Sequence, residues 1–138
     1  MNIDLNPDGP HSPERTAEVA AIFDACSRFL VYATLGGAPG LDYPAEMYSL
    51  LGELYSATGR MQQLFGQLRL FLRKQANDGK LGDRSGRDIQ ISVSEACGAL
   101  VEAGHQSAAL TSLLQEAQKE IAGLHGKPRA EQHRGERG

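Results

Sequence analysis

Cysteine and aromatic residues are scarce in this sequence, and tryptophan is absent. The two cysteines, Cys26 and Cys97, lie far apart, which indicates neither a disulfide-dense secreted scaffold nor a paired-cysteine metal motif. No apolar run approaches the roughly 18 residues of a membrane span. The opening stretch, MNIDLNPDGPHSPER, is acidic and polar, unlike a cleavable signal peptide. We therefore expect a protein of the reducing cytoplasm without membrane association.

An excess of positive charge is also lacking. The net charge of -3 argues against a protein that coats nucleic acid along its whole surface. The 138 residues are 41% apolar and 22% charged, which are ordinary values for a globular protein. A chain of this length suits one domain with a modest core.

Proline and glycine are concentrated in four stretches that divide the chain. The two ends, residues 1–12 and 125–138, are predicted to be disordered tails around one helical domain, residues 13–124. Two internal breaks, GGAPGLD (36–42) and NDGKLGDRSG (77–86), separate three segments of helical periodicity. The sequence thus predicts an all-α protein. Its expected helices cover about 13–35, 43–76 and 86–124.

Capping residues precede each expected helix. Ser12 stands before the first, and either Asp42 or Tyr43 stands before the second. The third opens with SGRD, in which Ser85 and Asp88 have the spacing of a capping box.

Apolar residues recur at alternating spacings of three and four in all three segments, which is typical of coiled-coil-like packing. The first stripe is Val19, Ile22, Cys26, Phe29 and Ala33. The second seam is Tyr43, Met47, Leu50, Leu54, Ala57, Met61, Leu64, Leu68 and Phe71. The third seam is Ile89, Val93, Ala96, Leu100, Ala103, Ser107, Leu110, Leu114, Ala117, Ile121 and Leu124.

The second and third helices are expected to form a long antiparallel hairpin, because a turn of only about ten residues joins them. A turn centred near Leu81 places Ala57 beside Ser107. Small residues from both helices then meet at the midpoint and allow the backbones to approach closely. These residues are Ala57, Thr58, Gly59, Gly104, Ser107 and Ala108.

The first helix is too short to cover the whole hairpin. We expect it to cover the half away from the turn and to leave the half at the hairpin tip open. Such an apolar patch is rarely left exposed, and a second copy of the chain is its expected cover, with another helical protein as the alternative. The predicted interface residues are Leu64, Phe65, Leu68, Phe71, Leu72, Val93, Leu100 and Val101.

Charge is distributed unevenly along the chain. Residues 60–88 carry a net charge of +4, whereas residues 1–24 carry -4. The hairpin tip is therefore basic, and nucleic acid, anionic lipid or an acidic protein are candidate partners for it, although solvated charge flanking a turn is the simpler interpretation. The candidate contacts to an anionic partner are Arg69, Arg73, Lys74, Lys80, Arg84 and Arg87.

No constellation of residues predicts catalysis. Glu102 and His105 have the Glu-x-x-His spacing of di-iron bundles, but the third seam turns both side chains outward. Cys26 and Cys97 fall on or beside apolar seams, where cysteine behaves as a small hydrophobe. We expect no enzymatic activity, no metal site and no cofactor.

A small chain with a long antiparallel hairpin of coiled-coil seams resembles the WXG100 (ESAT-6-like) helical-hairpin proteins. The resemblance covers Asp42 to Leu124 and is architectural: the turn reads NDGKLGDRSG without the Trp-x-Gly motif, and no tyrosine follows Tyr55. It implies a small dimeric partner or substrate of type VII secretion. The stretch LDYPAEMYSLLGELYSATGRMQQLF is also similar to small helical proteins of high-GC Gram-positive bacteria.

The sequence therefore favours a non-enzymatic interaction or regulatory module that acts as a helical homodimer. A nucleic-acid-associated accessory protein that uses the basic tip is one alternative. A hairpin protein linked to type VII secretion is the other.

Overall fold

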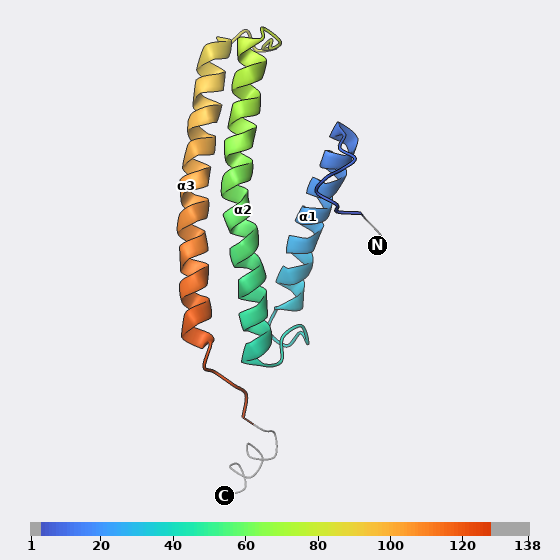
Figure 1. Cartoon of the computed structure of the whole chain (residues 1–138), viewed down its shortest axis with the longest axis vertical. Coiled ribbons are helices and arrows are strands. Elements are labelled where there is room, and N and C mark those ends of the chain that lie inside the picture. The colour runs from blue at the N-terminus through green and yellow to red at the C-terminus, as the bar shows by residue number, and fades with distance from the viewer. Residues whose placement is uncertain (1–3, 128–138) are drawn as a thin grey trace, which may run out of the picture. The chain divides into compact units, whose positions relative to one another are not determined.

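The protein is all-α, as predicted. The computed structural model describes residues 4–127 and shows no strand within them. Its helices are α1 (Pro13–Ala33), α2 (Pro44–Asn77) and α3 (Ile89–Ile121) (Figure 1). The chain forms two compact units, one ending at Asp42 and one beginning at Tyr43. Part of each predicted tail, residues 1–3 and 128–138, lies outside the described residues.

The first unit contains α1, which begins as the sequence predicts. The Ser12 hydroxyl accepts a hydrogen bond from the Arg15 backbone N–H at 3.1 Å, and Pro13 occupies the first turn, where a missing N–H costs nothing. None of the residues of α1 is buried. Cys26, expected on a buried stripe, is exposed, so that expectation is wrong; its own short helix supplies no neighbour that covers the thiol.

The second unit is the predicted hairpin. Helices α2 and α3 run antiparallel and side by side, each about 50 Å long at 1.5 Å per residue (Figure 1). Helix α2 begins where the Glu46 carboxylate accepts a hydrogen bond from the Tyr43 backbone N–H at 3.4 Å. Tyr43 is therefore its N-cap residue, one of the two that the sequence proposes.

Helix α3 starts at Ile89, three residues later than predicted, because Asp88 caps it. The Asp88 carboxylate accepts from the Gln90 backbone N–H at 2.8 Å. Ser85 cannot serve as the expected cap because it belongs to the turn: its hydroxyl and its backbone N–H donate to Asp83 Oδ1 at 2.5 and 2.7 Å. Gly86 then has a φ of 76°, a left-handed conformation that favours glycine and keeps the helix from starting earlier.

The midpoint of the hairpin is polar and closely packed. The Ser107 hydroxyl donates to the Thr58 carbonyl oxygen at 2.6 Å, and the Thr111 hydroxyl donates to the Thr58 hydroxyl at 2.7 Å. Thr58, Gly104 and Ser107 are all buried. The predicted meeting of small residues at this level is confirmed, and the predicted register is right to within about one residue.

The core of the hairpin is built on two facing heptad rows, which we call the seam, and the buried Cys97 and Gly104 lie beside the α3 row. One row lies on α2 and the other on α3. The α2 row is Leu51, Thr58, Phe65 and Leu72. The α3 row is Val93, Leu100, Ser107 and Leu114. All eight side chains are buried or half-buried in this structure.

The α3 row belongs to the predicted α3 seam, although Leu110, which was also expected there, is 47% exposed. The seam on α2 lies one position further along the chain than predicted. Leu64, Leu68 and Phe71 were expected in it and are instead exposed, with exposed fractions of 48%, 45% and 62%. Phe65 and Leu72 take their place between the helices. The predicted row and the observed row are adjacent on α2, and both are largely apolar. The row that contains Thr58 can approach the small residues of α3 more closely than a row of leucines can.

Replacing Ser107 by alanine is expected to lower the free energy of unfolding by about 1 kcal/mol, because the buried hydrogen bond to Thr58 is lost. Urea unfolding followed by circular dichroism would measure the change. Ser112 is exposed on the same helix, so Ser112→Ala is the matched control and should stay within about 0.5 kcal/mol of the wild type. Equal effects of the two substitutions would contradict a structural role for the midpoint hydrogen bond.

Candidate interaction surface

The predicted interface residues divide into two groups in the structure. Four of them belong to the seam and hold α2 against α3: Phe65, Leu72, Val93 and Leu100. Val93 is only 6% exposed, so it offers no surface to another molecule. The remaining four, Leu64, Leu68, Phe71 and Val101, are exposed.

Three of the exposed residues line up on one flank of α2. Leu64, Leu68 and Phe71 follow Met61 at spacings of three, four and three, which places all four side chains on one side of the helix. Leu50 and Ala57 continue the same stripe toward the start of α2. These six residues are most of those that the sequence predicts for the α2 seam. They form a second apolar stripe beside the α2 row that contacts α3.

A matching stripe on α3 lies on the same side of the hairpin. The opposite side is identified by its contacts: the Arg69 carbonyl oxygen accepts from Cys97 Sγ at 4.0 Å, and Gln118 Nε2 donates to the Tyr48 carbonyl oxygen at 3.1 Å. At 100° per residue, Leu68 and Ala96, the positions just before Arg69 and Cys97, lie on the other flank of the seam. The α3 stripe is Ala96, Ala99, Ala103, Leu110, Leu113 and Ala117.

We call these two stripes together the open face of the hairpin. Its α2 stripe is Leu50, Ala57, Met61, Leu64, Leu68 and Phe71. Leu110 and Leu113 on α3 are 47% and 61% exposed, so the apolar surface continues beyond the tip half toward the open end of the hairpin. Leu113 is absent from the predicted interface, although its spacing of three from Leu110 and four from Ala117 is a detectable signal.

Val101, the last of the predicted interface residues, lies elsewhere. It follows Leu100 and lies near 100° from the seam, on the side of α3 that carries Cys97 and Gly104. Its side chain is 43% exposed. The structure therefore brings Leu64, Leu68 and Phe71 together and separates Val101 from them.

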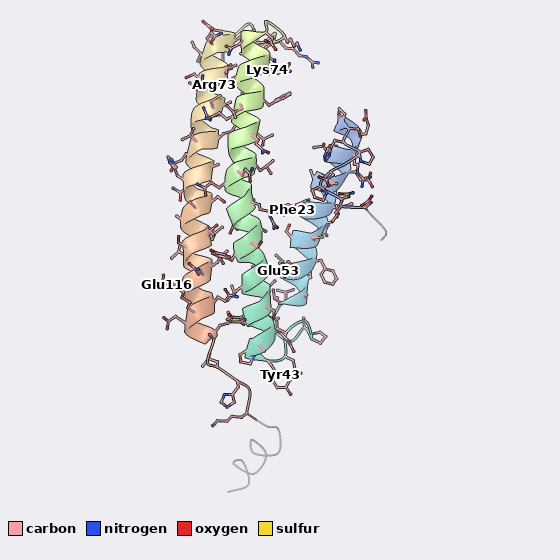
Figure 2. The ribbon with its side chains drawn as sticks, in the orientation of Figure 1. Phe23, Tyr43, Glu53, Arg73, Lys74 and Glu116 are labelled. Carbon is pink, nitrogen blue, oxygen red and sulfur yellow. The ribbon has the colours of Figure 1, made fainter. Side chains whose placement is uncertain are left out.

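The six predicted contacts to an anionic partner surround the turn of the hairpin. Figure 2 shows Arg73 and Lys74 at that end. Two of the six form ion pairs within the hairpin: Lys74 Nζ lies 2.9 Å from Asp78 Oδ2, and Arg87 lies 3.0 Å from Glu95 Oε2. Within residues 4–127, the structure shows no ion pair for the other four, Arg69, Arg73, Lys80 and Arg84.

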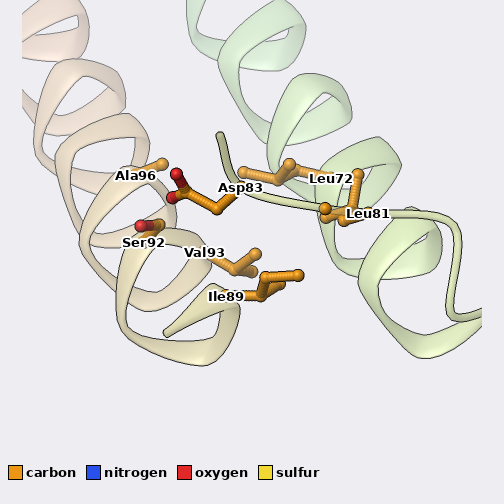
Figure 3. A pocket seen from close by; sticks show the side chains of 8 residues that line it. Leu72, Leu81, Asp83, Ile89, Ser92, Val93 and Ala96 are labelled. Carbon is orange, nitrogen blue, oxygen red and sulfur yellow. The ribbon is translucent and has the colours of Figure 1, made fainter. Parts of the chain in front are cut away.

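A small pocket of about 220 Å³ lies at the base of the turn (Figure 3). Leu81 and Asp83 of the turn lie over it, and side chains of α2 and α3 form its walls. The lining residues are Leu72, Leu81, Gly82, Asp83, Ile89, Ser92, Val93 and Ala96. The hydroxyl and the backbone N–H of Ser85 both donate to Asp83, which lowers the pKa of that carboxyl. The pocket is mostly apolar, and its one carboxylate is already engaged.

The Glu102–His105 pair does not line the pocket at the base of the turn. Glu102 Oε2 and His105 Nδ1 are 3.8 Å apart, and both side chains are well exposed, so the predicted outward orientation is confirmed. Residues 4–127 contain no group of three or more His, Cys, Asp or Glu side chains placed to hold a metal ion. Within the same residues, no helix combines the length and the apolar character needed to cross a membrane.

Comparison with protein-family models, with curated proteins and with solved structures finds no match to this chain.

Proposed function

We propose that this protein is a non-enzymatic interaction module of the cytoplasm that acts as a helical homodimer through its open face. The observation that carries the proposal is the continuity of this face. Large apolar side chains that are about half exposed follow the hairpin from Phe71 near the turn to Leu113 near the other end. Folded monomers seldom expose contiguous apolar patches of more than a few hundred Å².

The dimensions of the face suit a stable protein–protein interface. The hairpin is about 50 Å long, and two helices packed side by side are about 20 Å wide. A flat face of this size has an area of roughly 1,000 Å², compared with about 800 Å² that each partner buries in a standard interface.

A second copy of the chain is the partner we favour. Most oligomers of a single chain are two-fold symmetric dimers, in which the same patch of both copies is buried. An interaction module needs no catalytic centre, and the only candidate pair that the sequence offered, Glu102 and His105, is solvated on the outside of the hairpin.

Light scattering during size-exclusion chromatography of the purified chain, with no other protein present, tests this proposal. A mass of twice the chain mass of 14.9 kDa supports the homodimer. A mass of 14.9 kDa that persists as the protein concentration rises contradicts it.

The cations at the hairpin tip favour a second function, that of a nucleic-acid accessory protein. The side chains of Arg73, Lys80 and Arg84 are exposed and form no ion pair within the described part of the chain. Cations presented in this way can neutralise phosphates and release counterions, so binding would weaken steeply as salt is added.

If the tip binds nucleic acid, the triple variant Arg73→Glu, Lys80→Glu and Arg84→Glu should lose at least tenfold in affinity for labelled DNA or RNA at low salt. Each lost phosphate contact removes the release of about one counterion, which is the source of this loss. Fluorescence anisotropy would measure binding. Reversal of Lys119 and Lys127, at the other end of the hairpin, is the matched control and should change affinity little. A flat titration of the wild type at low salt would rule out this function.

A further inference from the structure

We propose that the two hairpins pair antiparallel, so that the turn of each lies beside the open end of the other and α2 packs along the α2 of its partner. This inference rests on the proposed homodimer and adds its geometry. It extends the interface along the whole open face. Three features of the described residues carry it: the sizes of the side chains, their register and the charges at the two ends.

The open face changes character at its middle. In the half near the turn, the large side chains are on α2, namely Leu64, Leu68 and Phe71, and α3 contributes alanines. In the other half, the exposed large side chains are Leu110 and Leu113 on α3, whereas Leu50 and Leu54 on α2 are half-buried. A two-fold axis across the middle therefore brings the half of each helix that projects exposed large side chains against the half of the same helix in the partner that does not, as close packing requires.

The register of this pairing is specific. If α2 pairs with its copy about a point between Arg60 and Met61, Leu64 meets Ala57 of the partner subunit and Phe71 meets Leu50 of the partner subunit. Because Thr58 faces Ser107, the same axis crosses α3 between Gly104 and His105, and it places Leu113 against Ala96 and Leu110 against Ala99 of the partner subunit. In this one register Leu64 on α2 and Leu110 and Leu113 on α3 each face an alanine of the partner subunit.

A two-fold axis parallel to the helices would also match large with small side chains, because α2 would then face the α3 of the partner. Charge distinguishes the two arrangements. Residues 69–95, around the turn, carry six cations and four carboxylates, a net charge of +2. The opposite end, residues 43–53 and 113–127, carries four carboxylates and two cations, a net charge of -2. Figure 2 shows this separation, with Arg73 and Lys74 near the turn and Glu53 and Glu116 toward the other end.

The parallel arrangement would place like ends together, basic beside basic and acidic beside acidic. The antiparallel arrangement places each basic tip beside an acidic end. The same separation of charge occurs on α2 alone. A heptad row along the rim of the open face begins with Glu46 and Glu53 at the open end and ends with Lys74 near the turn. In the register above, Glu46 lies near Lys74 of the partner subunit. Exposed charges contribute little to affinity, but they select orientation and register.

Two cysteine variants, each in a Cys26→Ser background, test the arrangement in the full chain. Cys97 is 1% exposed and should not react. Met61→Cys lies close to the proposed two-fold axis and should be cross-linked to its own copy by a short bis-maleimide. Gly59→Cys, two residues away on the opposite flank of α2, is the matched control and should remain uncross-linked.

A spin label at Asn77→Cys, at the end of α2 beside the turn, gives an independent distance. The antiparallel dimer predicts a separation between labels of about 50 Å, the length of the hairpin. Close labels together with no Met61→Cys cross-link would overturn the antiparallel arrangement while leaving the homodimer intact. If Met61→Cys is not cross-linked, the spin labels show no interaction with each other and the chain has the mass of a monomer, the homodimer itself is overturned.

Discussion

Replacing Leu68 by glutamate is expected to convert the proposed homodimer to a folded monomer. Leu68 is in the middle of the large apolar side chains of the open face, and dimerisation would bury a carboxylate there with no cation to pair with it. We expect the dimer dissociation constant to rise at least 100-fold, which corresponds to about 3 kcal/mol. Sedimentation velocity at matched concentrations would measure dissociation, and circular dichroism would verify that the helices remain.

Leu70→Glu is the matched control. Leu70 is two residues further on, 200° around the same helix, and its side chain is 59% exposed. This variant adds the same charge to α2, but on the side away from the open face, and should remain dimeric. If Leu70→Glu dissociates the dimer and Leu68→Glu does not, the interface lies on the opposite side of the hairpin.

Replacing Leu51 by alanine is expected to lower the free energy of unfolding by about 2–4 kcal/mol, since truncating a buried leucine leaves a cavity between the helices. Leu51 is 9% exposed in the seam. Urea unfolding at a fixed protein concentration would measure the loss, because the stability of a dimer depends on concentration.

Leu70→Ala provides the reference for Leu51→Ala, because an exposed leucine loses little when it is truncated. Its effect should stay within about 0.5 kcal/mol. Similar losses for the two variants would show that the seam does not run through Leu51, and would contradict the packing of α2 on α3 described above.

The sequence predicts the helices and their pairing well because local signals agree with one another. Ser12 and Pro13 define the start of α1, and Pro44 defines the start of α2. The short turn requires an antiparallel hairpin, and the small residues around Thr58 and Ser107 set its register. These features depend on spacing and residue size, which can be read without knowledge of the fold.

The seam of α2 is the feature that periodicity predicts wrongly. Apolar residues cover a wide sector of this helix, and the stripe through Leu64 and Leu68 is more regular than the row through Leu51, Thr58 and Phe65. Periodicity identifies the apolar sector of α2, but it does not show which part of the sector contacts α3 and which part belongs to the open face. The close contact at the midpoint decides the division: Thr58 faces Ser107, and the leucines are left for the open face.

The candidate surface is therefore predictable in part. Leu64, Leu68 and Phe71 are predicted from the sequence as an interface and lie together on the open face. Phe65, Leu72 and Leu100 are predicted in the same interface, but they lie in the seam between α2 and α3. Their position depends on how each helix is rotated about its own axis, which the sequence pattern does not specify. The ion pairs at the tip likewise depend on the turn, whose conformation has no periodic signal.

The most direct test of the account is whether the open face touches a second copy of the chain. An isotope-filtered nuclear Overhauser experiment on a mixture of methyl-labelled and unlabelled protein detects contacts between copies only. We predict intermolecular cross-peaks from the methyl groups of Leu64, Leu68 and Leu113. Their absence at concentrations where the chain is otherwise well folded would contradict the proposal that a second copy covers this face.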